Sequence, residues 1–425
     1  MNRPRRRLRG LDFYLSFVWM TDFGGRMKRV LKAIGFLIIE FLVLIVLYIA
    51  LLTIANIKTS NKSLDNMTLS VGLIDEEGDY PSVYGDDASK LDNFTDRLMI
   101  QKCMLSDDNP FLSALNMGGY QRYWHGYVVF LKPLFSFANI LQIRKLLSLA
   151  LFILATVCIT LLYRRTGWPG ALAFSVMWAE YYLHVVSGSL QYFWCCFVCC
   201  LLVAVICLIP EDKRRILPFL FFGTGSFVSF VDLLTFPLIT LTVPLIVMAF
   251  TDKKKNGQIK KIGIYSVLWG IGYMATWATK WLLGYCFLGK GIVSDVSDTI
   301  VFRMIGDASH EINRLLVLQA NLQHPYLLHH FVFLLGVTLV SIIPFVILTV
   351  KENKEEIKRM AVITPILLYP YCWYEVVCSH SLIHHFFTYR TQMGTSFGLY
   401  LVIFMAWKGI LAQIRKQHLQ RKIEE

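Results

Sequence analysis

The sequence predicts an all-α polytopic membrane protein of about ten transmembrane helices, with an acidic first outer loop that carries interfacial helices. The chain of 425 residues is 56% hydrophobic and only 17% charged, and its mean hydropathy is +0.52. This composition is too apolar for a soluble domain and is typical of a chain that crosses a bilayer. The net charge of +13 does not indicate nucleic acid as a partner, because the basic residues stand in short clusters between apolar runs.

The first predicted span is residues 31–57, which hold a single acid, Glu40, and are long enough to cross a bilayer as a helix. A secretory signal with a small-residue cleavage site is absent, so this span is expected to be retained. Residues 1–30 are predicted to be a basic cytoplasmic tail. The sequence equally allows translation to start at Met27, which would make the preceding residues an upstream extension.

Apolar runs and basic clusters alternate along residues 141–414, which are predicted to form the transmembrane bundle. Its spans are expected at residues 141–163, 169–186, 190–209, 216–231, 235–250, 262–287, 326–349, 360–378 and 396–413. With ten spans, both termini and all the main basic clusters lie in the cytoplasm, including the short tail 415–425. This parity requires residues 231–237 to form a tight outer turn and not a kink within one span.

Residues 58–140 form the predicted first outer loop, which is expected to be the catalytic loop and holds eleven of the chain's 29 acidic residues. Its stretch 109–139 is amphipathic and aromatic, which favours short helices lying in the membrane interface. Asp92 and Asp96 share one face if their segment is helical, where they could act as a general base or as metal ligands. Alternatively, Asp92 caps the helix and Asp96 stabilises its first turn or pairs with Arg97.

Ten further residues are candidates for binding a substrate, because they are aromatic or ionisable and lie at or near the predicted outer surface. They are Arg122, Trp124, His125, Tyr127, Asp232, Lys280, His380, His384, Tyr389 and Arg390. Planar aromatic side chains suit sugar faces, and the cationic or histidine side chains suit a phosphate. The alternative for the aromatic segments is an interfacial belt, which membrane proteins carry routinely.

Two of these candidates, Asp232 and Lys280, are ionisable groups at or within the membrane, where such groups usually face the bundle interior. Asp232 stands in the predicted outer turn and could simply be hydrated. Lys280 requires either a substrate anion or a structural ion pair, for which Glu180 and Asp232 are the available partners. Arg144, at the outer start of the second span, could face a phosphate or extend to lipid headgroups.

No metal site is predicted. His380 and His384 have helical spacing that permits a shared metal, but carboxylates are distant in sequence and the HExxH pattern is absent. The CxxC spacing within residues 195–200 lacks a second pair of ligands nearby. A cofactor is therefore not required, although a divalent metal is compatible with the sequence.

In its layout the chain resembles the GT-C superfamily of membrane glycosyltransferases. The shared features are a first span, an acidic loop with Asp92 and Asp96, interfacial segments and a further bundle of spans. The resemblance extends to bacterial proteins of cell-surface polysaccharide loci through residues 92–96, 123–127 and 380–390. It implies a polyprenyl-phosphate-linked sugar donor and a glycan or lipid-linked acceptor on the outer face of the bacterial cytoplasmic membrane. It also implies that Asp92 or Asp96 is the base. The chain lacks the large C-terminal outer domain of the better-known members, which leaves the acceptor open.

The chemistry of such a transfer fits the residues present. A carboxylate at the membrane surface can take the proton of an acceptor hydroxyl, and cations can stabilise the phosphate that leaves. Arg122, His125, His384 and Arg390 are expected to converge on one pocket facing the first-loop carboxylates. Two alternatives stay open. One is a polysaccharide polymerase or ligase of the O-antigen type, which would need arginine and histidine but neither Asp92 nor Asp96. The other is a lipid-linked oligosaccharide flippase or other transporter.

Overall fold

The structure is a computed structural model that describes residues 8–106, 108–252, 257–289, 291–306, 312–323, 328–349 and 353–424. Of the two possible start residues, Met1 lies outside the described residues and Met27 lies within them. The protein is 83% helical and no strand occurs among the residues described, which confirms the all-α class. The chain divides into two compact units, Met1–Leu47 and Tyr48–Glu425.

The described residues of the first unit belong to helix α1 (Leu8–Ala55), whose last residues belong to the second unit. The helix begins within the predicted tail, so residues 8–30 are helical. Its segment Val30–Ala55 is apolar and long enough to cross a membrane, as the sequence predicts for the first span.

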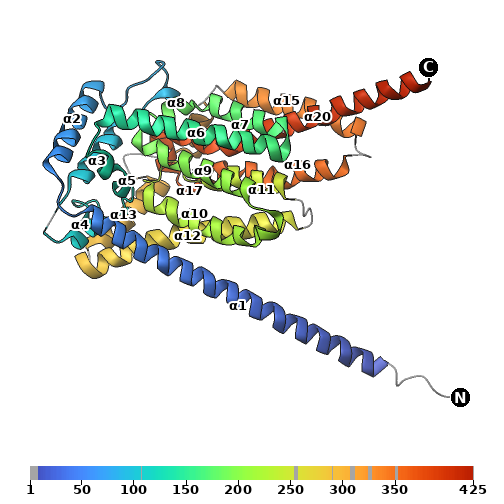
Figure 1. Ribbon diagram of the computed structural model, residues 1–425, viewed down its shortest axis with the longest axis horizontal. Coiled ribbons are helices and arrows are strands. Elements are labelled where there is room, and N and C mark those ends of the chain that lie inside the picture. Colours follow the sequence, from blue (N-terminus) through green and yellow to red (C-terminus); the bar gives the residue numbers. More distant parts are fainter. Residues whose placement is uncertain are drawn as a thin grey trace. The chain divides into compact units, whose positions relative to one another are not determined.

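Short helices build the predicted first outer loop and lie at one end of the bundle of the second unit (Figure 1). They are α2 (Asn61–Glu77), the 3₁₀ helix η1 (Asp87–Ser89), α3 (Asn93–Met104), α4 (Pro110–Asn116) and α5 (Val128–Leu134). Helices α4 and α5 fall within the stretch 109–139 in which short helices are expected. Asn109 caps α4 through Leu112 N, and Pro110 occupies the first turn, where its missing N–H costs nothing.

The remaining helices form the bundle and its outer connections. They are α6 (Ile140–Thr166), α7 (Trp168–Glu180), α8 (Leu183–Val186), α9 (Leu190–Leu208), η2 (Glu211–Ile216), α10 (Leu217–Val231), α11 (Ile239–Thr251), α12 (Gln258–Leu288), α13 (Gly291–Ile305), α14 (Arg314–Leu322), α15 (Leu328–Thr349), α16 (Lys354–Leu367), α17 (Tyr369–Val376), α18 (Cys378–Ile383), α19 (His385–Thr388), η3 (Tyr389–Gln392) and α20 (Met393–Glu424).

Five helical stretches have the length and apolar composition to cross a membrane. They are Val30–Ala55, Ile140–Thr166, Leu190–Leu208, Val332–Thr349 and His385–Glu424. Each of the other predicted spans coincides with a helix or a pair of helices, but several of these are short. Helix α11, with 13 residues, is about 20 Å long, against a hydrocarbon core of about 30 Å. The membrane class is thus supported, whereas the number of ten spans is not confirmed.

The predicted turn near residue 232 separates two helices, because α10 ends at Val231 and α11 begins at Ile239. Asp232 stabilises this connection by accepting a hydrogen bond from Thr235 N at 2.9 Å. The connection is therefore not a kink within one helix. Its location on the outer side of the membrane stays a prediction.

The bundle is held together by an apolar centre and by one very close helix pair. Every residue of α11 is buried, as expected for a helix that is apolar on all sides. Helices α10 and α12 touch through their backbones: a Cβ at Gly225 would lie 2.0 Å from Trp269 O, and one at Gly272 would lie 2.2 Å from Phe222 O. On α15, by contrast, Val340 and Ile347 are about 70% exposed, as lipid-facing side chains are.

Candidate functional site

Asp92 is the N-cap residue of α3. Its Oδ1 accepts a hydrogen bond from Thr95 N and its Oδ2 accepts one from Thr95 Oγ1, each at 2.9 Å. The side chain is only 2% exposed. This burial raises the pKa of Asp92 to about 7, with further contributions from the charges of Asp96 and Asp79, while the bonds from Thr95 oppose the shift. Asp92 thus caps the helix, as the structural alternative predicts, and can also exchange a proton near neutral pH.

Asp96 lies one turn further along α3 and has different surroundings. It is fully buried and accepts hydrogen bonds from Ser189 Oγ at 3.0 Å, Leu190 N at 3.0 Å and Gln191 N at 3.1 Å. These donors form the start of α9, where a helix has unpaired N–H groups and favours a negative charge. Burial raises the pKa of Asp96, although Arg144 and the α9 donors counteract it. Asp96 therefore anchors the first loop to α9.

The ion pairs around these carboxylates differ from those expected. Arg97 pairs with Asp75 at 2.6 Å and Asp79 at 2.5 Å, and not with Asp96. Arg144 is 8% exposed and donates hydrogen bonds to Glu77 Oε2 and Asn93 Oδ1, each at 2.7 Å, and it approaches Asp96 at 3.5 Å. The expectation that Arg144 faces a phosphate or lipid headgroups is not met, because its charge is used to join α6 to α2 and α3.

An aromatic cluster adjoins Asp92 and was not among the predicted binding residues. Tyr80 stacks on Phe94 with ring centroids 6.4 Å apart, and it meets Phe386 of α19 edge-on at 5.3 Å. Tyr80 is 43% exposed and Phe94 is 52% exposed. The sequence signal was weak: Phe94 follows Asp92 by two residues, whereas Tyr80 precedes it by twelve and reaches it only through the fold. The cluster joins the first outer loop to the segment 380–390.

Tyr389 and Arg390 attach to the same loop. Tyr389 Oη and Arg390 Nη2 both donate to the carbonyl oxygen of Ala88 in η1, each at 2.9 Å. The guanidinium of Arg390 is fully buried between the rings of Tyr192 and Tyr389, with 4.8 and 4.7 Å to their centroids. Among the described residues no carboxylate lies within ion-pair distance of it. Arg390 is thus a buried cation whose charge is met by carbonyl oxygens and aromatic faces.

His380 and His384 lie side by side, with ring centroids 4.8 Å apart. His380 Nε2 donates to Leu234 O at 2.7 Å, so its Nδ1 must accept the hydrogen bond that Arg303 donates. Burial, with the charge of Arg303, lowers the pKa of both rings, that of His384 to about 4. Both histidines are therefore neutral at pH 7. The positive charge beside them belongs to Arg303 of α13, which was not among the predicted binding residues.

A metal site at the two histidines gains no support. In the part of the chain that the structure describes, no group of three or more His, Cys, Asp or Glu side chains is arranged to hold a metal ion.

The residues around His125 use their polar atoms within the fold. Arg122 pairs with Asp295 at 2.6 Å, and the Trp124 indole donates to Thr276 O at 2.8 Å. His125 Nε2 donates to a backbone carbonyl, that of Tyr120, at 2.9 Å, so Nδ1 accepts from Tyr127 Oη at 2.7 Å. Burial lowers the pKa of His125 to about 3, which keeps the ring neutral.

Lys280 is fully buried, and its partner is not the one expected. Its Nζ donates to Leu115 O at 2.7 Å and to Ala114 O at 3.2 Å, and it lies over the Trp124 ring. These carbonyls belong to the last turn of α4, where a positive charge is favourable. The anticipated ion pair with Glu180 or Asp232 is therefore replaced by a helix C-cap.

The structure brings the segment 380–390 against the loop of Asp92, whereas Arg122 and His125 contact Asp295 and Tyr120. The convergence of Arg122, His125, His384 and Arg390 on one pocket stays a prediction.

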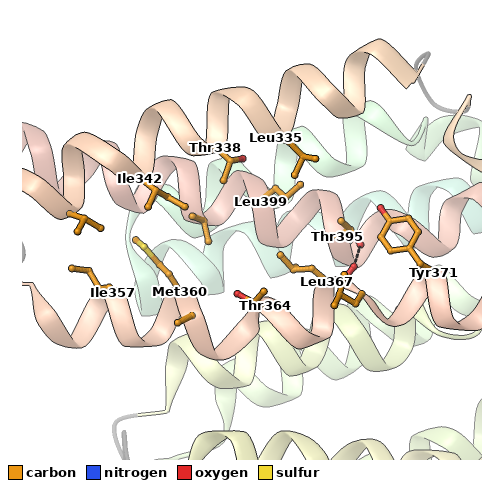
Figure 2. Close-up of a pocket in the computed structure, with 14 residues that line it drawn as sticks. Leu335, Thr338, Ile342, Ile357, Met360, Thr364, Leu367, Tyr371, Thr395 and Leu399 are labelled. Carbon is orange, nitrogen blue, oxygen red and sulfur yellow. Dashed lines mark hydrogen bonds between the residues drawn. The ribbon is translucent and has the colours of Figure 1, made fainter.

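An apolar groove of about 420 Å³ runs between α15, α16, α17 and α20 (Figure 2). It extends from Leu335 to Val346 along α15, a distance of about 16 Å at the rise of a helix. The hydroxyls of Thr338 and Thr395 donate to helix carbonyls at 2.7 Å, so they leave the lining apolar. At the other end from Val346, Tyr371 Oη lies 3.4 Å from the amide oxygen of Gln392, in the same short helix η3 as Arg390.

No known protein family, no curated protein and no solved structure matches this chain.

Proposed function

We propose that the protein is a membrane glycosyltransferase that moves a sugar from a polyprenyl-phosphate donor to a glycan or lipid-linked acceptor on the outer face. The observation that carries this proposal is the burial of Asp92 at the start of α3, beside the exposed rings of Tyr80 and Phe94. A general base works best when its pKa lies near the working pH, and that of Asp92 is raised to about 7. Asp96 is the weaker candidate, because all its bonds are committed to α9 and Arg144.

The surroundings of Asp92 suit a sugar. Tyr80 and Phe94 offer exposed ring faces beside it, and aromatic rings provide apolar, flat contact surfaces. In the proposed reaction the oxygen of an acceptor hydroxyl forms a bond to the anomeric carbon. The hydroxyl proton passes to Asp92, and the bond from the anomeric carbon to the phosphate oxygen breaks, with its electron pair leaving on the phosphate.

The lipid part of the donor is assigned to the apolar groove. Its lining has the chemistry of a hydrocarbon site, and Thr395, at the end of the groove near Tyr371 (Figure 2), is only five residues from Arg390. The leaving phosphate needs cations, and Arg390 and Arg303 are the arginines of this region that we assign to it. Arg390 would reach a phosphate by exchanging its bond with the Ala88 carbonyl. A divalent metal is compatible with this reaction but is not needed for it.

A polysaccharide polymerase or ligase is the second candidate, and the cluster of Arg303, His380 and His384 favours it. In that reaction the arginine and histidine side chains are essential, and Asp92 is only a helix cap. The two proposals therefore differ in what they expect of the Asp92→Asn variant.

Mass spectrometry of a deletion strain tests the proposed class of reaction. If the protein is a transferase, one sugar should disappear from the surface glycan of the deletion strain, and the corresponding polyprenyl-phosphate-linked monosaccharide should accumulate. A polymerase or ligase predicts that complete repeat units stay on the lipid carrier, because chain growth or attachment fails after the unit is built. Unchanged glycans and unchanged lipid-linked sugars would contradict both.

A further inference from the structure

A second hollow, of about 620 Å³, lies where the C-terminal end of α1 meets the start of α2 and the helix α5. One part of its lining is apolar and includes Leu51 and Ile54, which belong to the first candidate span. The other part follows the end of that span and includes Thr59, Ser60 and Ser63. The hollow thus changes from apolar to polar along the direction in which a lipid changes from chain to headgroup.

Two hydroxyls in the polar part lack a hydrogen-bond partner. Thr59 is 8% exposed and Ser63 is 2% exposed, and neither Thr59 Oγ1 nor Ser63 Oγ has a partner among the residues that the structure describes. A buried hydroxyl without a partner costs about 1–3 kcal/mol. Because both residues line the hollow, a ligand that accepts hydrogen bonds there would remove this cost.

The charge of the hollow specifies the kind of acceptor. Helix α2 begins here: Ser60 caps it through Ser63 N at 3.2 Å, and the N–H groups of the first turn favour an anion. Lys58 and Lys132 also line the hollow, and among the residues described no acidic side chain does. Lys132 Nζ donates to Leu105 O at 3.1 Å, which uses one of its three N–H groups.

We propose that this hollow binds the phosphate headgroup of an anionic membrane lipid, with Thr59, Ser63 and the start of α2 contacting the phosphate. Lys58 and Lys132 supply the positive charge, and Leu51 and Ile54 contact the first part of the chain. A free phosphate would use only the polar part, whereas a lipid uses both, and the polar part directly follows a membrane span.

The proposed lipid site is separate from the site of Asp92. The opposite end of α2 contacts α3, where Asn93 donates to Glu77 Oε2 and to Gly78 O. Since α2 has 17 residues, its two ends are about 25 Å apart. The inference therefore does not rest on the proposed transferase activity.

Native mass spectrometry of the full-length protein in detergent tests the inference, with phosphatidylglycerol and phosphatidylcholine as probes. The wild type is expected to bind phosphatidylglycerol more tightly than phosphatidylcholine. The double variant Thr59→Val, Ser63→Ala is expected to lose about tenfold or more in affinity for phosphatidylglycerol, because two bonds to a charged group disappear. Lys58→Gln, a change of an exposed side chain, should reduce the preference for the anionic lipid.

The matched control is Thr156→Val, which removes a hydroxyl that is exposed on α6 and bonded to Phe152 O at 2.8 Å. It should leave binding unchanged. Equal affinity for the two lipids would overturn the proposal, as would wild-type binding by both the double variant and Lys58→Gln. Inorganic phosphate at millimolar concentration should not displace the lipid; full displacement would show a site for free phosphate and would overturn the assignment to a lipid.

Discussion

Replacing Asp92 and Asp96 one at a time by asparagine distinguishes the chemical role proposed for Asp92 from the structural role of Asp96. In Asp92→Asn, the amide oxygen can still accept from Thr95 N. The amide nitrogen can donate to Thr95 Oγ1, which rotates to accept. Asparagine and aspartate cap helices about equally well. The variant is therefore expected to fold with a stability within about 1 kcal/mol of the wild type, while it loses the base.

In Asp96→Asn no orientation of the amide preserves every bond. One oxygen of Asp96 accepts from Ser189 Oγ and Gln191 N, and the other accepts from Leu190 N and Arg144. An amide nitrogen in either place faces a backbone N–H, which is left without an acceptor at a cost of about 1–3 kcal/mol. The charge of Arg144 also loses one partner, which brings the expected loss of stability to roughly 2–5 kcal/mol.

Thermal unfolding of the purified proteins in detergent measures this difference, with Asp79→Asn as the control for loss of a half-exposed acid. The expected order is a large decrease in Tm for Asp96→Asn and little change for Asp92→Asn and Asp79→Asn. A Tm for Asp96→Asn equal to that of the wild type would refute the assignment of Asp96 as the anchor of the first loop. A strongly lowered Tm for Asp92→Asn would refute the argument that asparagine can replace it as a cap.

Three further outcomes are expected. Gly225→Ala should abolish the monodisperse peak in size-exclusion chromatography, because its Cβ would lie 2.0 Å from Trp269 O, whereas Gly263→Ala has open space and should elute as the wild type. Lys280→Met should lower the stability by about 1–3 kcal/mol, because the α4 carbonyls lose their donor; an unchanged Tm would contradict the C-cap. Burial lowers the pKa of His125 to about 3, so the stability that the neutral ring contributes is complete above pH 6.5 and is lost as the pH falls. The Tm of the wild type should therefore decrease on acidification, and that of His125→Gln should decrease less. A Tm that rises on acidification, or an equal pH dependence in the two proteins, would contradict this.

The helical membrane class can be predicted from the sequence because it depends only on the order of residue types along the chain. Long apolar runs separated by basic clusters are sufficient to indicate it. The sequence also places the turn at Asp232, where a polar residue and a proline interrupt two apolar runs. The number of spans is harder to predict, because helices such as α11 are apolar but too short to cross a bilayer unaided. Apolarity does not distinguish a buried core helix from a lipid-facing one.

The candidate site is predictable only where the contacts are local. The spacing of Asp92 and Asp96 indicates one helix and a possible cap, and both are present. The donors to Asp96 from the start of α9, however, are more than 90 positions away in sequence. Lys280 is paired with backbone carbonyls, and every residue type has a carbonyl. Residue identity therefore cannot reveal these partners.

The most direct test of the central claim is the initial rate at which purified protein consumes the lipid-linked sugar that accumulates in the deletion strain, followed by mass spectrometry in the presence of acceptor. The wild-type rate should rise with pH through about 7, as Asp92 loses its proton. Asp92→Asn should be slower by roughly a hundredfold or more at normal stability, in line with the contribution of a general base. A wild-type rate for a folded Asp92→Asn protein would contradict the assignment of Asp92 as the base of a glycosyl transfer.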